Sequence, residues 1–302
     1  MSLRALVPAR VGWLLLGAAA SLVALTASCA KADERTTFAA EPVDPFPDAG
    51  AGAESGSFAE AGAVPVAVDE AECSQETKQI YVVATDKVLY RFYPDTLAFV
   101  RIGTLGCPTT AGTFSMAIDR RGTAWVEYTD GRLYAVNTTN ATCKPTAFVP
   151  GQTGFTTFGM GYAKNGDTAN GETLYVAGAG LASLDTKTFQ LSLLGSLTFG
   201  RTELTGLDTS LFAFSVGSGV VAGLNKATGA TEVTYRTSAT EADSAFAFAQ
   251  WGGDFWLFTG SEHTTVTRYS PITDVSTVAV QDTGMLIVGA GSSTCAPTKT
   301  PR

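Results

Sequence analysis

An aromatic residue recurs at a nearly constant interval through most of this 302-residue chain. Successive members are 44, 50, 37 and 44 residues apart, and each lies in a short apolar run such as IYVV or FWLF. The five residues are Tyr81, Trp125, Tyr175, Phe212 and Trp256. A repeat of about 40 to 50 residues built from strands is typical of propellers, because one unit buries its apolar face only against its neighbours. The interval therefore predicts five blades.

Each unit contains further strand-like runs around its aromatic residue. The aromatic run is followed by a second apolar run, then by a corner rich in Asx and Thr, and then by a last run such as TEVTYRT. Another run, such as TELTGL or AFAFAQ, precedes it in every unit except the first, and a leftover run, GMLIVGAG, occupies residues 284–291. We predict an all-β, five-bladed propeller of four-stranded blades. Residues 284–291 would complete the first blade and so remove exposed sheet edges.

The N-terminal segment predicts export. Arg4 and Arg10 precede an apolar run that ends in small residues directly before Cys29. Residues 1–28 resemble a bacterial lipoprotein signal peptide, which implies that Cys29 is lipidated and holds the protein on a membrane of the cell envelope. Ala30 favours the outer over the inner membrane. A plain secretory signal with an incidental cysteine is the alternative.

The composition divides the rest of the chain into three parts. Residues 30–72 are rich in Ala, Gly, Pro and acids and show no periodicity. Such a segment buries too little apolar surface to offset its ordering entropy, so residues 29–72 are predicted to form a lipidated, disordered tether. A segment that folds on a partner is the alternative. The propeller is expected over residues 73–295, with a disordered tail over 296–302.

The remaining four cysteines favour disulfides over a metal site in an exported chain. Cys73 lies just before the first strand and Cys295 just after the closing strand, so a bridge between them would hold the ring closed. Cys107 would then pair with Cys143 by elimination. No Cys-x-x-Cys spacing occurs and His263 is the only histidine, so we expect no metal.

The charge and the absence of catalytic motifs narrow the function classes. A net charge of −8 provides no basic surface for a phosphate backbone, so nucleic-acid binding is not expected. The sequence has no glycine-rich phosphate loop and no nucleophile elbow. We therefore expect no cofactor, and we expect a monomer.

Carboxylates near the starts of the first strands of blades provide a hydrolase hypothesis. Some five-bladed propellers are glycosidases, which use two carboxyl groups facing the central funnel. The candidates are Glu203, Asp243 and Asp282.

Aromatic residues near the same rim provide the alternative that we favour, a non-catalytic binding module for a protein or a glycan. Their rings could stack on sugars or form an apolar surface for a protein partner. The candidates are Phe155, Phe158, Tyr162 and Trp251.

Two resemblances support the same fold. Residues 119–126, DRRGTAWV, resemble the Asp-x-x-Gly-x-x-Trp hairpin of propellers related to streptogramin lyases and sensor-kinase ectodomains. Residues 155–161, 203–206, 245–258 and 287–291 are similar to stretches of an uncharacterised group of bacterial propeller lipoproteins. That likeness extends over about residues 73–295. It implies a fold and a compartment, and no activity.

Overall fold

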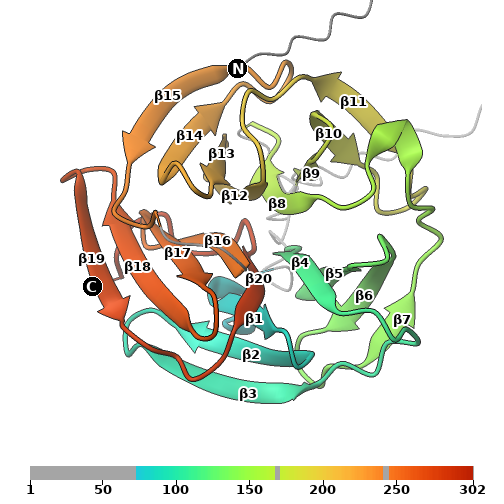
Figure 1. Ribbon diagram of the computed structural model, residues 1–302, viewed down its shortest axis with the longest axis horizontal. Helices are drawn as coiled ribbons and strands as arrows, with labels where there is room; N and C mark the ends of the chain where they lie inside the picture. Colours follow the sequence, from blue (N-terminus) through green and yellow to red (C-terminus); the bar gives the residue numbers. More distant parts are fainter. Residues whose placement is uncertain (1–72, 167–170, 241–244, 302) are drawn as a thin grey trace, which may run out of the picture. The chain divides into compact units, whose positions relative to one another are not determined.

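The structure, a computed structural model, describes residues 73–166, 171–240 and 245–301. These residues form five antiparallel sheets of four strands each, arranged in a ring (Figure 1). The predicted five-bladed propeller is therefore confirmed. The predicted signal peptide, the lipidated Cys29 and the tether lie outside the described residues.

The blades are named here in chain order, with the innermost strand of each first. Blade 1 contains β20 (Ile287–Ser292), β1 (Ile80–Ala84), β2 (Val88–Tyr93) and β3 (Ala98–Thr104). Blade 2 contains β4 (Thr113–Ile118), β5 (Thr123–Tyr128), β6 (Leu133–Asn137) and β7 (Cys143–Pro145). Blade 3 contains β8 (Gly159–Lys164), β9 (Glu172–Ala177), β10 (Leu181–Leu184) and β11 (Leu191–Gly195). Blade 4 contains β12 (Thr202–Leu207), β13 (Ser210–Ser215), β14 (Val220–Leu224) and β15 (Thr231–Arg236). Blade 5 contains β16 (Ala245–Trp251), β17 (Asp254–Gly260), β18 (Thr264–Ser270) and β19 (Val275–Val280). Short 3₁₀ helices η2 (Glu76–Lys78) and η3 (Gln152–Gly154) precede β1 and β8.

The C-terminal strand closes the ring as the sequence predicted. Strand β20 pairs antiparallel with β1, with Tyr81 opposite Gly291 and Val82 opposite Ala290. Figure 1 shows the red β20 beside the blue β1, so the two ends of the described chain share one sheet. The pairing hides the inner edge of β1, which would otherwise be an unpaired edge within the ring.

The hydrophobic core lies between the blades. Five clusters of buried side chains fill the five interfaces between neighbouring blades of the described chain. Each recurring aromatic residue belongs to the cluster that joins its own blade to the next one around the ring. The repeat in the sequence is therefore a repeat of packing, because every interface needs one large ring to fill it.

Glycines let the innermost strands of adjacent blades approach closely. A Cβ on Gly161 of β8 would lie 2.5 Å from the carbonyl oxygen of Leu204 on β12. A Cβ on Gly206 of β12 would lie 2.2 Å from the carbonyl oxygen of Tyr162. The backbones of these strands are therefore in direct contact, and little space is left between blades 3 and 4 along this part of the ring.

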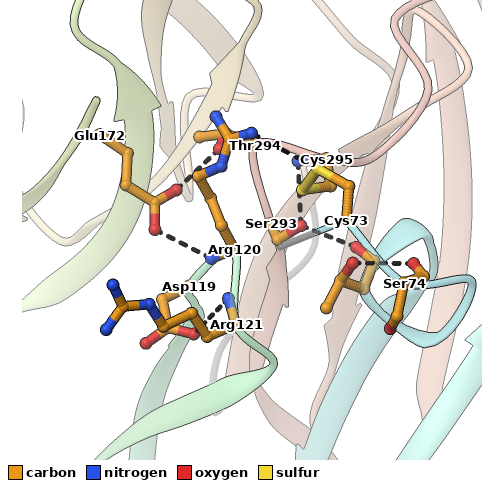
Figure 2. The surroundings of a disulfide bond; sticks show 10 residues. Cys73, Ser74, Asp119, Arg120, Arg121, Glu172, Ser293, Thr294 and Cys295 are labelled. Carbon is orange, nitrogen blue, oxygen red and sulfur yellow. Dashed lines mark hydrogen bonds between the residues drawn. A yellow bond between two sulfur atoms is a disulfide. The ribbon is translucent and has the colours of Figure 1, made fainter. Parts of the chain in front are cut away.

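Both expected disulfides are present. Cys73 and Cys295 join residues 222 positions apart, with a Cα–Cα distance of 5.5 Å (Figure 2). Cys107 and Cys143 are 36 positions apart, with a Cα–Cα distance of 5.1 Å. Cys107 follows the outer strand β3 of blade 1 and Cys143 begins the outer strand β7 of blade 2, so this bridge joins neighbouring blades at the outside of the ring.

Residues 296–301, within the segment that was expected to form a disordered tail, belong to the described part of the chain. Ala296 is buried in the cluster between blades 5 and 1. The amide of Gly252, in the β16–β17 turn, donates a hydrogen bond to the carbonyl of Pro297, and the hydroxyl of Thr300 donates to the carbonyl of Gly252. Residues 296–301 therefore lie against blade 5, because Gly252 and Gly253 leave room for a second backbone segment there.

Candidate functional site

A cavity of about 270 Å³ lies where the innermost strands of four blades begin, and we call it the mouth cavity. The starts of β4, β8, β12 and β16 contribute Phe114, Phe158, Glu203 and Phe246. Another part of the wall is formed by Ala177, at the end of β9, and by residues 178–179 in the turn that leads to β10. The cavity is therefore built by residues from four blades that are far apart in the sequence.

Glu203 is the acid of the mouth cavity. Glu203 lies on β12 of blade 4 and is only 2% exposed. Its Oε2 accepts hydrogen bonds from Ser115 Oγ of blade 2 (2.9 Å) and from the Met160 amide of blade 3 (3.3 Å). Burial raises the pKa of Glu203 well above its ordinary value, although these two hydrogen bonds and the charge of Arg201 act in the opposite direction.

A second buried carboxyl, Glu127 of β5, lies behind the wall of the cavity and was not among the predicted site residues. Its Oε2 accepts a hydrogen bond from the Phe158 amide (2.9 Å), and its Oε1 has no partner among the described residues. Burial, followed by the charge of Glu203, raises the pKa of Glu127 well above its ordinary value. The signal in the sequence was a lone acid at the end of the apolar run AWVE.

Arg201 is the only cationic residue among the described residues that line the mouth cavity. It immediately precedes β12, and the centre of its guanidinium lies 4.9 Å from the ring centroid of Phe246. Arginine stacks readily on aromatic faces in this way, and stacking restricts the orientation of its donors. No pattern in the sequence selects this residue, because its aromatic partner comes from another blade.

The four aromatic residues that were expected to meet a ligand are all buried in the core. Only Phe158 lines the mouth cavity. The indole Nε1 of Trp251 donates a hydrogen bond to the carbonyl of Lys78, near the other end of the innermost strands. Burial leaves Phe155, Tyr162 and Trp251 as packing residues, and the structure does not bring the four together into a stacking surface.

The structure does not group the three candidate acids. Glu203 lines the mouth cavity, whereas Asp243 lies outside the described residues. Asp282 is exposed, and its Oδ1 lies 3.1 Å from Nδ1 of His263. The backbone amide of Gly284 and then His263 hold the pKa of Asp282 below its ordinary value. His263 lines a different hollow, beside blade 5, so Asp282 belongs to a separate polar pair.

A second hollow of about 550 Å³ lies where the innermost strands end. The Cys73–Cys295 disulfide forms part of its wall, and Arg120 Nη2 lies 3.5 Å from Cys73 Sγ. Glu172 accepts hydrogen bonds from the Arg120 amide (2.9 Å) and from Thr294 Oγ1 (2.7 Å), and Thr294 directly precedes Cys295 of this disulfide (Figure 2). Burial raises the pKa of Glu172 to about 7, despite these hydrogen bonds.

Two other kinds of site have no counterpart in the described part of the chain. Its His, Cys, Asp and Glu side chains form no group of three or more suited to a metal ion. None of its helices is long and apolar enough to cross a membrane.

Sequence comparisons give no family. No protein-family model matches the chain, and no curated protein sequence matches it.

Solved structures share the general arrangement at low identity. A chain of a nidogen/laminin complex matches 71% of this chain and 85% of its own length, at 13% identity and a TM-score of 0.45. A protein of unknown function from Bacteroides caccae matches over 70% and 97%, at 12% identity and a TM-score of 0.41. The extracellular domain of a proposed one-component system from B. thetaiotaomicron matches over 70% of this chain at 14% identity and a TM-score of 0.37, and the present chain spans only 28% of it. Likeness at this level does not identify a function.

Proposed function

We propose that this protein is an exported, lipid-anchored propeller that binds a protein or glycan ligand in its mouth cavity without transforming it. The observation that carries the proposal is the cavity itself. Residues from four blades enclose a space that contains an aromatic wall, one cation and one buried acid. Ligand sites are typically concave and mainly apolar, with a few polar groups that orient the ligand.

The carboxyl chemistry favours binding over hydrolysis. A glycosidase uses two carboxyl groups about 5 to 10 Å apart on either side of the scissile bond. Glu203 is the only carboxylic acid among the described residues that line the mouth cavity. The Oε2 atom of Glu203 is held by two hydrogen bonds from other blades, which gives this side chain a role in joining blades 2, 3 and 4.

The proposed location rests on the disulfides and on the N-terminal sequence. Two disulfides suit an oxidising compartment outside the cytoplasm. We propose that residues 1–28 direct export, that lipid on Cys29 anchors the protein to the outer membrane, and that residues 29–72 tether the propeller. Cys29→Ser should move the protein from the membrane fraction to the soluble fraction. Retention of the variant in the membrane fraction would contradict the anchor.

Filling the cavity tests the binding function. Gly200 lines the mouth cavity, and a Cβ built on it has no atom within 4 Å, so Gly200→Trp should place an indole in the cavity without backbone strain. Gly106 is equally open and lies outside the cavity, so Gly106→Trp is the matched control. Purified full-length chains should be compared on a glycan array and as bait in pull-downs from cell-envelope extracts.

The expected result is that wild type and Gly106→Trp retain the same ligand and that Gly200→Trp loses it. Equal melting temperatures of the two variants would show that the loss is local. Ligands captured equally well by Gly200→Trp would place binding elsewhere on the protein and refute the mouth cavity as the site.

A further inference from the structure

The mouth cavity contains a positive charge that no acid of the described residues pairs with directly. The Arg201 guanidinium makes no hydrogen bond and no ion pair there; it stacks on the face of Phe246 and acts electrostatically on Glu203. Such stacking leaves the N–H donors at the edge of the guanidinium plane available. Arg201 is exposed, so these donors are accessible from solvent.

Glu203, the acid of the cavity, forms no hydrogen bond and no ion pair with Arg201. It is buried, and its Oε2 is bound to Ser115 and Met160 instead. The N–H donors of Arg201 are therefore not occupied by this carboxyl, and an anionic group that enters the cavity can reach them.

The size and polarity of the rest of the cavity restrict the ligand. Its volume of about 270 Å³ lies just below the ~300 Å³ lower end of pockets for drug-sized ligands, so it suits one ring-sized group. Phe114 is half-buried and presents an aromatic surface. Thr156 and Thr157 also line the cavity, and their hydroxyls make no hydrogen bond among the described residues. Free hydroxyls beside an aromatic ring suit a ligand with one apolar face and several hydroxyl groups.

We propose that the mouth cavity binds a uronic acid unit at the end of an acidic glycan, with the sugar carboxylate paired to Arg201. The sugar hydroxyls would meet Thr156 and Thr157, and the apolar face of the ring would contact Phe114. This inference rests on the proposed binding function of the cavity.

The charge distribution favours a single carboxylate over a polyanion. Arginine binds a carboxylate through two parallel N–H···O bonds, which provides direction as well as attraction. Arg201 is the one cation among the described residues that line the cavity, and the chain has a net charge of −8, so the cavity offers no extended basic surface for a phosphate-rich or sulfate-rich polymer. The carboxylate of one terminal sugar requires no more than this single partner.

A matched pair of ligands tests the proposal directly. Methyl glucuronide and methyl glucoside have the same ring and hydroxyls, except that the first carries a carboxylate where the second carries a hydroxymethyl group; the galacto pair repeats the comparison. A glutamate-rich peptide tests the alternative of an acidic protein partner. Binding of each probe to the purified full-length chain should be measured by calorimetry and ligand-observed NMR, at millimolar ligand concentration.

Three variants locate the contact. Arg201→Gln removes the charge, and Arg201→Lys retains it without the two-pronged donor geometry. Arg132→Gln is the control, because Arg132 is an exposed arginine that lies outside the mouth cavity. A charge-assisted hydrogen bond contributes about 1.5 to 3 kcal/mol, so Arg201→Gln should weaken glucuronide binding roughly 10- to 100-fold. Arg201→Lys should give an intermediate loss, and Arg132→Gln no loss.

The outcomes separate this inference from the proposed function. Binding of the glucuronide that depends on Arg201 and exceeds binding of the glucoside supports the inference. Equal binding of both sugars, or glucuronide binding that Arg201→Gln leaves unchanged, overturns the acidic ligand; the proposed function still stands if Gly200→Trp abolishes that binding. Binding of the peptide alone overturns the glycan assignment. If no sugar binds, the inference is wrong.

Discussion

Removing the disulfide that closes the ring should destabilise the protein strongly without changing its fold. The perturbation is the double variant Cys73→Ser/Cys295→Ser. The β20–β1 pairing and the contacts of the C-terminal tail stay in place in this variant, so the folded state should persist. The main change is expected in the unfolded chain, which gains the freedom that the cross-link removes.

The size of the effect follows from the length of the loop. For a separation of 222 residues, the chain-entropy model gives a loss of roughly 5.5 kcal/mol in the free energy of unfolding. The Cys107–Cys143 bridge lies within this loop and shortens it by about a sixth, which lowers the figure by only ~0.2 kcal/mol because the dependence on length is logarithmic. A loss of this size is a large part of the 5 to 15 kcal/mol that is typical of folded domains.

Urea denaturation followed by tryptophan fluorescence measures both the free energy and its dependence on urea. The control is Cys107→Ser/Cys143→Ser, whose separation of 36 residues gives a loss of roughly 4 kcal/mol by the same model. The ring-closing variant should therefore lose roughly 1.5 kcal/mol more than the control. Its m-value should also increase, because a less constrained unfolded chain exposes more surface.

One pattern of results would refute this reasoning. If the ring-closing variant lost less stability than the control and its m-value did not change, the long loop would not be the source of stabilisation. The strand pairing between β20 and β1 would then hold the ring closed without help from the cross-link.

Three further predictions concern buried acids and close-packed glycines. Glu172→Gln should flatten the pH dependence of the free energy of unfolding. The pKa of Glu172 in the folded protein is about 7, above the ordinary value of 4.5, so its contribution to stability is present below pH 4.5 and is lost as the pH rises to about 7. This loss lowers the free energy of unfolding of the wild type by up to ~3 kcal/mol. Equal slopes for wild type and variant in denaturation series between pH 4 and 8 would contradict this. Glu203→Gln should likewise become more stable relative to the wild type as the pH rises, because the pKa of Glu203 is raised in the folded protein. The amide oxygen of glutamine can still accept the hydrogen bond from Ser115. If the difference in free energy of unfolding between variant and wild type did not change between pH 5 and 9, this prediction would be wrong. Gly161→Ala should lower the free energy of unfolding by about 1 to 3 kcal/mol or more, because the new methyl group meets the backbone of β12. Gly106→Ala is the control and should be nearly neutral, because a Cβ at Gly106 has open space around it. Similar melting temperatures for the two variants would refute the close contact of the innermost strands.

The fold was predictable because its signals are local and repeated. An apolar run with at least one large aromatic residue forms the second strand of every blade, and the recurring aromatic residue packs in an interface between blades. The absence of a first strand before Tyr81 and the spare run at residues 284–291 together predicted the closure, which the structure places at Ile287–Ser292. The cysteines were predictable for the same reason, since Cys73 and Cys295 flank the two strands that had to pair.

The residues of the cavity were harder to predict because the innermost strands are buried on both faces. Five of the six residues in each of β4, β12 and β20 are buried. Without an exposed face, alternation of polar and apolar residues does not indicate which side chains point toward a neighbouring blade and which line a cavity. Tyr162 and Trp251 were therefore assigned to a ligand surface although they pack in the core, whereas Glu127 was missed.

The sequence by itself determined the architecture: five blades, a ring closed by the last strand, and the Cys73–Cys295 bridge across that closure. The Cys107–Cys143 pairing followed from the sequence only by elimination, and the structure shows it. These properties depend on spacing along the chain, which a sequence records directly. Only the tertiary structure placed Arg201 on Phe246 and connected Glu203 to Ser115 and Met160. Those contacts join different blades, and their geometry depends on how closely the glycine-lined innermost strands approach, a distance that no spacing in the sequence encodes.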